Sequence, residues 1–237
     1  MLSGTSALAT EKVTNIDEEK EVILVQNMEE KDLSKLFLKA KFETDLKGKD
    51  EVIKDSKGNI VYKTSQTLKK SKNKKGEIDE KVAVTTFSKI DIPSNDITPL
   101  TNNITSLTLS SSKGDGKWDS SYSAYLYSTV YYTKLTYNNK SCAKMDYSTG
   151  GVSDLNSGVQ VQSMLVRIGQ VSAYWPSTTS QVKETYYYGG TFTIYPNSNW
   201  IPVPDTFGLY GSILGCTMEV TLGRSSRTWS ETFTNNL

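Results

Sequence analysis

Hydrophobic and polar residues alternate with a period of two along much of the second half of the chain, which predicts β-strands. The longest such run covers residues 118–137. One side carries a predicted core face of Tyr122, Ala124, Leu126, Val130 and Tyr132. The other side alternates small hydroxyl residues with phenols, namely Ser121, Ser123, Tyr125, Tyr127, Thr129 and Tyr131. Because Leu135 and Tyr137 then continue on the polar side, we expect a bulge or turn near Thr133 and Lys134.

Shorter alternating runs follow at the spacing of a β-sandwich. They cover residues 105–110, 160–168, 191–195, 216–222 and 227–234. The most regular of them places Cys216, Met218, Val220 and Leu222 on the inner face. We therefore predict an all-β protein with an antiparallel β-sandwich over residues 101–237.

The first hundred residues predict a small region of charged β-hairpins with little helix. Alternation favours a strand over residues 37–46, preceded at most by a short helix that starts near Asn27. A turn at residues 55–59 separates it from strands at 60–68 and 82–90, and the lysine-rich residues 69–75 form a solvated hairpin tip. Residues 10–100 are a separate domain, a prosegment, or strands that complete the sheet of the second half.

Composition separates the same two regions and excludes several chemistries. Most charged residues precede residue 100 and most aromatic residues follow it, while the whole chain has a formal net charge of +1. That charge does not predict nucleic-acid binding. The chain contains no histidine, which excludes Ser-His-Asp and Cys-His catalysis and histidine-ligated metals. We expect no cofactor, no metal and no transmembrane span.

The first nine residues end in Ala7-Leu8-Ala9, followed by charged chain, as at the end of a signal peptide. We interpret residues 1–9 as a signal-peptide remnant and expect a secreted or cell-surface protein. The composition is similar to that of many exported Gram-positive bacterial proteins.

Cys142 and Cys216 are the only cysteines, and an exported chain favours a disulfide between them. Cys216 lies on the apolar side of its predicted strand, whereas Cys142 alternates with charged residues. Two independent thiols are therefore the alternative.

Three groups of aromatic residues are candidates for ligand binding. Trp200 lies in a proline-rich loop, where it either stacks against a sugar or closes one end of the sandwich. The other candidates are tyrosines on strands or at their ends, namely Tyr125, Tyr127, Tyr131, Tyr186, Tyr187 and Tyr188. Each group is also compatible with ordinary packing on a sheet surface.

These observations predict a non-catalytic binding protein, whose partner is a glycan or an extracellular protein. A pore-forming protein is one alternative, because it too would use Ser/Thr-rich hairpins. A glycosidase that works with two carboxylates is the other, since it needs no histidine.

Overall fold

The computed structural model describes residues 21–46, 53–55, 58–91, 123–153, 159–173, 178–207, 211–224 and 226–237. The predictions for residues 1–9, the linker near 93–101, the strand 105–110 and the start of the run at 118–122 lie outside these ranges.

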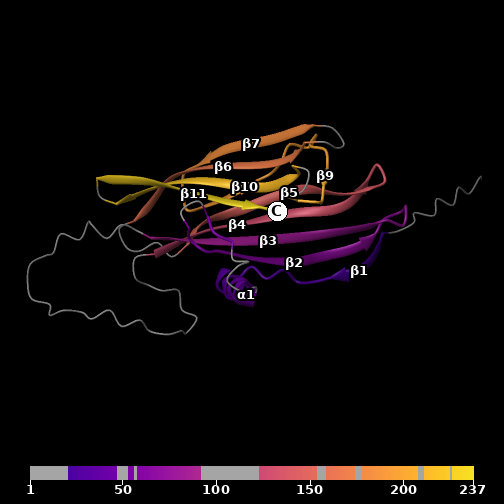
Figure 1. Cartoon of the computed structure of the whole chain (residues 1–237), viewed down its shortest axis with the longest axis horizontal. Helices are drawn as coiled ribbons and strands as arrows, with labels where there is room; N and C mark the ends of the chain where they lie inside the picture. Colours follow the sequence, from indigo (N-terminus) through magenta and orange to yellow (C-terminus); the bar gives the residue numbers. More distant parts are fainter. Residues whose placement is uncertain are drawn as a thin grey trace, which may run out of the picture.

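Two antiparallel sheets pack face to face, as the alternation predicts, and the all-β sandwich-like fold is confirmed (Figure 1). The larger sheet is seven-stranded and has the order β1-β2-β3-β4-β5-β8, with β9 also paired to β5. Its strands are β1 (Val22–Gln26), β2 (Val61–Lys72), β3 (Ile78–Asp91), β4 (Ser123–Tyr137), β5 (Lys140–Ser153), β8 (Thr191–Ile194) and β9 (Val203–Pro204). The smaller sheet has the order β11-β10-β6-β7 and consists of β6 (Gln160–Ser172), β7 (Thr179–Tyr187), β10 (Ile213–Arg224) and β11 (Arg227–Asn236).

The main core lies between the two sheets. The predicted inner face of β4 is confirmed, because Ala124, Leu126, Val130 and Tyr132 are all buried there. The predicted inner face of β10 is buried against it, and Leu222 and Met218 are fully covered. Phe192 and Ile194 of β8 complete the same core.

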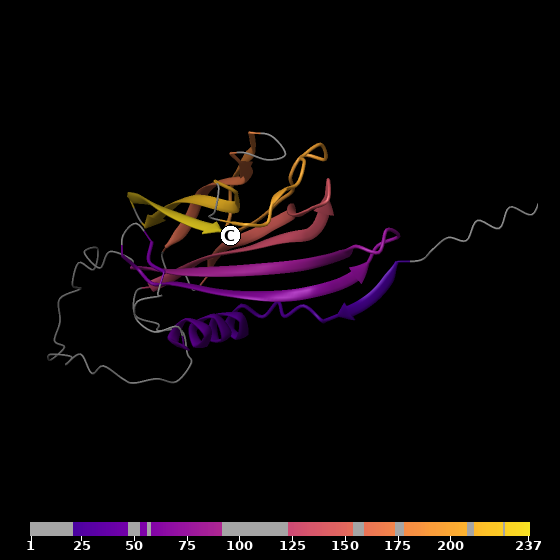
Figure 2. The same cartoon turned by 45° about the vertical axis from the view of Figure 1, so that its right-hand side comes forward.

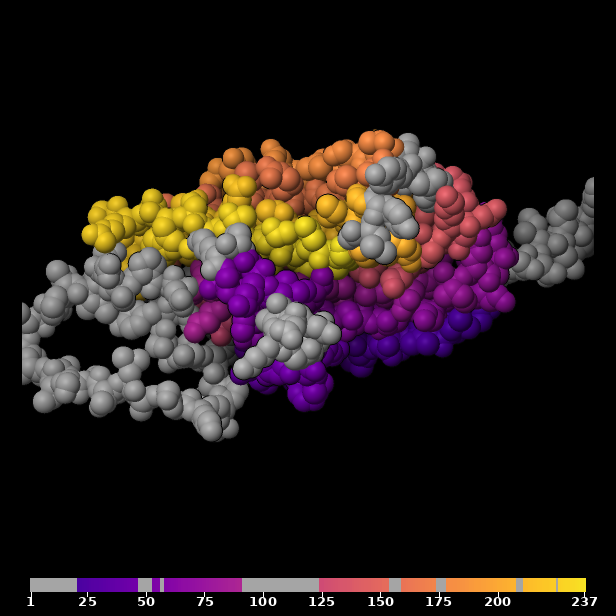
Figure 3. All heavy atoms as spheres, viewed as in Figure 1, coloured from indigo at the N-terminus to yellow at the C-terminus, as the bar shows by residue number. Residues whose placement is uncertain are grey.

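Strands from both parts of the chain pair directly, since β3 lies beside β4 from Asp91↔Ser123 to Glu80↔Lys134. The charged hairpins therefore complete the sheet of the second half, which is one of the three arrangements that the sequence left open. Figure 2 shows β2 and β3 running beside β4 and β5. In the space-filling view of Figure 3, atoms of the early strands lie directly against those of β11.

A buried asparagine joins the two sheets. Asn235 of β11 donates to the carbonyl oxygens of Val84 and Ser128, at 3.1 Å each, and accepts a 2.7 Å hydrogen bond from the Thr86 hydroxyl. Its side chain is 1% exposed. These bonds fix β11 against β3 and β4, because a buried amide without partners would destabilise the fold.

The predicted strand at residues 37–46 is wrong, because residues Leu33–Leu46 form the helix α1. Asp32 caps the helix, since its carboxylate accepts hydrogen bonds from the backbone N–H groups of Ser34 and Lys35. Every second residue shares one face of a strand, but on a helix successive members of such a set lie on opposite sides. Leu36, Ala40 and Thr44 are buried, whereas Leu38, Phe42 and Leu46 are exposed.

The irregularity expected near Thr133 lies in the neighbouring strand. β4 stays in register with β3 as far as Lys134, while its register with β5 shifts between Tyr131 and Tyr132. Asp146 is the extra residue of β5, and its carboxylate accepts a 2.9 Å hydrogen bond from the Thr133 hydroxyl. The bulge is therefore in β5, and it is held by β4.

The two cysteines are free and buried, so the structure does not contain the expected disulfide. Cys142 lies in β5 and Cys216 in β10, next to Ser148. Cys142 and Ser148 are six residues apart in β5, which corresponds to roughly 20 Å along a strand. A disulfide requires Cα atoms within about 7 Å, so this arrangement does not allow one.

Candidate functional site

The outer face of the larger sheet, which faces away from β10, carries a row of threonines. Each member lies opposite the next on the adjacent strand, from β2 through β3, β4 and β5 to β8. We call this the threonine row: Thr64, Thr85, Thr129, Thr149 and Thr193. Directly paired residues share a face, so the five side chains form a line across the strands. Within this line the hydroxyl groups of Thr85 and Thr129 are hydrogen-bonded to each other at 2.9 Å.

α1 covers one part of this face and leaves another part open. Phe37 contacts the rings of Tyr62, Phe87 and Tyr125 with ring centroids 5.2, 5.5 and 5.0 Å apart. Leu36 and Ala40 are buried in the same cluster. Because the helix lies over β2 and β3 (Figures 1 and 2), the half of the threonine row nearer β8 is outside its cover.

Three tyrosines stand beside the threonine row. We call Tyr131, Tyr147 and Tyr195 the tyrosine stack, because Tyr131 and Tyr147 are parallel at 4.1 Å and Tyr147 and Tyr195 are tilted at 5.5 Å. Tyr195 is 58% exposed at the end of the stack. The stack forms an aromatic wall along one side of the threonine row.

Two adjoining cavities, one on this face and one at its edge between β8 and Tyr187 of β7, are together called the outer-face groove. The covered cavity, of 330 Å³, lies under residues 27–32, the connector between β1 and α1; it is lined by Glu29, Glu30, Gln66, Thr129 and Tyr131 among others. The open cavity, of 390 Å³, extends to β8 and is lined by Thr149, Gly150, Tyr187, Thr191 and Phe192 among others. Tyr127 and Thr149 line both cavities, so the two adjoin at these residues.

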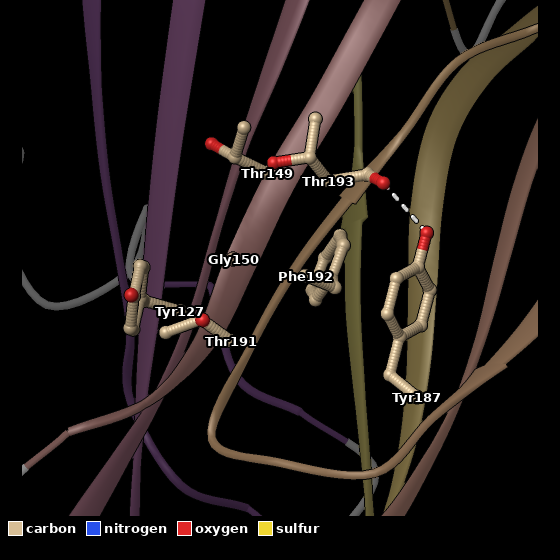
Figure 4. Close-up of a pocket in the computed structure, with 7 residues that line it drawn as sticks. All are labelled: Tyr127, Thr149, Gly150, Tyr187, Thr191, Phe192 and Thr193. Carbon is tan, nitrogen blue, oxygen red and sulfur yellow. Dashed lines mark hydrogen bonds between the residues drawn. The ribbon is translucent and has the colours of Figure 1, made fainter.

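Glycine at position 150 allows β4 and the Phe192 ring of β8 to approach β5 closely. A Cβ atom there would lie 2.4 Å from the Tyr127 carbonyl oxygen and 2.7 Å from the Phe192 ring. Figure 4 shows Tyr127 and Tyr187 on opposite sides of the cavity, with Gly150 and Phe192 between them. The Tyr187 hydroxyl donates a 2.6 Å hydrogen bond to the Thr193 carbonyl oxygen, which holds β7 beside β8.

The phenols of the groove are neutral at physiological pH. Burial, followed by the 2.5 Å hydrogen bond to Glu29, raises the pKa of Tyr131 well above its ordinary value. Burial also raises the pKa of Tyr127 and of Tyr147. The groove therefore presents neutral phenols and hydroxyl groups.

Both carboxylates of the groove have lysine partners. Glu29 lies 3.6 Å from Lys31, and Glu30 lies 3.4 Å from Lys35. A hydrogen bond from the Asp32 backbone N–H lowers the pKa of Glu30, so this carboxyl is ionised and accepts hydrogen bonds. This combination of hydroxyls, phenols and compensated charge suits a neutral ligand that has many hydroxyl groups.

The groove contains three of the seven aromatic residues that the sequence analysis singled out. Tyr127 and Tyr131 line the covered cavity, and Tyr127 and Tyr187 line the open one. Tyr186 and Tyr188 are exposed elsewhere; Tyr186 lies opposite Leu165 on the smaller sheet.

Two of the expected ligand-binding residues are buried instead. Tyr125 is 5% exposed because Phe37 packs on its ring, and Trp200 is 5% exposed because it packs into the core between the sheets. The groove therefore includes neither residue, and Trp200 is part of the core between the sheets.

Sequence reasoning missed the residues that complete the groove: Glu29, Thr149, Thr193, Tyr147 and Tyr195. The alternation of Tyr147, Thr149 and Gly151 in β5 and of Thr191, Thr193 and Tyr195 in and directly after β8 was a usable local signal. The alternation shows that the residues of each set share one face of their strand, but it does not show that the two strands are neighbours.

Within the described ranges, no group of three or more His, Cys, Asp or Glu side chains is placed to hold a metal ion. The same part of the chain includes no helix of the length and apolar character needed to cross a membrane. Comparison with known proteins finds no matching family model, no similar curated protein and no similar solved structure.

Proposed function

We propose that this is a secreted or cell-surface, non-catalytic protein that binds a carbohydrate in the outer-face groove. The observation that carries the proposal is the pair of adjoining cavities, which combine threonine hydroxyls with neutral tyrosines. Sugar rings present hydroxyl groups at their edges and C–H groups on their faces. Threonine and tyrosine match both features, and strands hold them rigidly, so that little side-chain entropy is lost on binding.

An extracellular protein is the other partner class that the sequence suggests. The size of the site favours the glycan, because the two cavities, of 390 and 330 Å³, are in the range of small-ligand pockets. A flat protein surface would not require such a recess.

A glycan array with the purified full chain, followed by calorimetry on the sugars that bind, tests the proposal. Thr193→Val removes a groove hydroxyl while it keeps size and strand propensity, and we expect affinity to fall about five-fold, as for one lost neutral hydrogen bond. Thr234→Val is the matched control: it changes an exposed strand threonine on the smaller sheet and should leave affinity unchanged. The proposal fails if no glycan binds, or if both variants bind as the natural protein does.

Two further assays separate this proposal from its alternatives. A pore-forming protein would release dye from liposomes, and a glycosidase would shorten the oligosaccharide that it binds. We expect neither activity. Dye release that persists across several lipid compositions would favour the pore-forming function instead.

A further inference from the structure

The covered cavity is closed at its end toward β2, and this closure limits which part of a glycan can enter it. On the side toward β2, the connector and β2 are joined by a reciprocal pair of hydrogen bonds. The Glu30 N–H donates to Gln66 Oε1 at 2.9 Å, and Gln66 Nε2 donates to the Glu30 carbonyl oxygen at 3.1 Å. The groove therefore does not continue past Gln66 among the described residues.

Two other sides of the covered cavity are also closed. Leu33 and Leu36 of α1 line one of them, and Leu36 is only 4% exposed. On the opposite side, the carboxylate of Glu29 lies 2.5 Å from the Tyr131 hydroxyl, and Tyr131 stacks on Tyr147. On the remaining side, Tyr127 and Thr149 line both this cavity and the open cavity.

From this geometry we propose that the protein recognises the end of a glycan chain: the terminal sugar enters the covered cavity, and the next sugars lie over Thr149, Thr191 and Thr193. An internal sugar of a polysaccharide is linked to another sugar on each side. The hydrogen bonds between the connector and β2 leave no path for the second of these sugars. This inference rests on the proposed carbohydrate-binding function and specifies which part of the glycan is bound.

Length dependence of binding tests it directly. The probes are maltohexaose, cellohexaose, chitohexaose and mannohexaose, each compared by calorimetry with a long soluble polymer of the same linkage, and cyclohexaamylose, which has no end. End recognition predicts the same affinity per chain for hexamer and polymer, within about two-fold, and no binding of the cyclic sugar if maltohexaose binds.

Recognition of internal units predicts instead that the number of binding sites per polymer chain rises with chain length. That result would overturn the inference and leave the carbohydrate-binding function in place. If neither these four series nor the glycan array gives a ligand, both the function and the inference fail.

A pair of variants tests the path of entry. Thr149→Phe places a ring where the two cavities meet, and we expect at least a ten-fold loss of hexamer affinity. Thr193→Phe places the same ring at the exposed end of the threonine row and should have the smaller effect. Unchanged affinity of a folded Thr149→Phe variant would refute the inference; if this variant does not fold, the length comparison still decides.

Discussion

Replacement of Asn235 by alanine tests the packing of the two sheets. The substitution removes three hydrogen bonds, one from Thr86 and two to the carbonyl oxygens of Val84 and Ser128. At about 1 kcal/mol for each neutral hydrogen bond, the free energy of unfolding should fall by about 3 kcal/mol. For a domain of this size, that corresponds to a fall in Tm of roughly 9 °C.

Urea unfolding followed by tryptophan fluorescence measures this loss, and Thr234→Ala on the outer face of the same strand is the control. Thr234 is exposed, so the control should change stability by less than about 0.5 kcal/mol. Thr86→Val removes only one of the three bonds and should cost about 1 kcal/mol. A loss below about 1 kcal/mol for Asn235→Ala would refute the view that this residue joins the sheets.

Three other predictions concern thiols, pH and a glycine. Burial raises the pKa of Cys142 and of Cys216 to about 11, so both thiols should resist a maleimide in the native protein. Both should react with it after unfolding without reductant. A protein mass lower by two hydrogens, with no thiol reacting, would show a disulfide instead. The raised pKa of Tyr131 keeps its phenol protonated in the folded protein, whereas in the unfolded chain the same phenol ionises near its ordinary pKa of 10.0. Above about pH 10 the unfolded state therefore binds fewer protons than the folded state, and stability should fall as pH rises. The urea midpoint should fall less steeply in Tyr131→Phe, and equal slopes would contradict this. Gly150→Ala should destabilise by about 1 to 3 kcal/mol because its Cβ meets the Tyr127 carbonyl and the Phe192 ring, whereas Gly169→Ala, with no neighbouring atom nearer than 3.7 Å, should cost clearly less in the same urea assay.

Strand faces could be predicted from the sequence because alternation is a local property. Leu126 and Val130 in β4 and Met218 and Val220 in β10 are buried as the alternation indicates. Helix α1 was not predicted, because its buried residues Leu36 and Ala40 are four apart and so also fit a period of two. The capping carboxylate of Asp32 was the local signal in favour of the helix.

The groove could be predicted only in part, because it depends on register between strands that are distant in sequence. Thr64 and Thr193 share a line only because four successive strand pairings are each in one particular register. If the register of any one pairing shifted by one residue, the threonines beyond that pairing would lie on the opposite face of the sheet. Tyr127 and Tyr131 were found because both lie on the single strand β4, where alternation alone places them together.

The groove also shows why the change in composition near residue 100 is a poor guide to where the site lies. Its aromatic wall comes from the tyrosine-rich part, since Tyr131, Tyr147 and Tyr195 are in or next to β4, β5 and β8. Its cover comes from the charged part, since the connector lies over the threonine row and Glu29 bonds to Tyr131. Charged residues suit the connector because it faces water on one side, and aromatic residues suit the sheet because they pack on its surface. The two compositions therefore describe the two sides of one site, and neither part of the chain would form the blind end of the groove without the other.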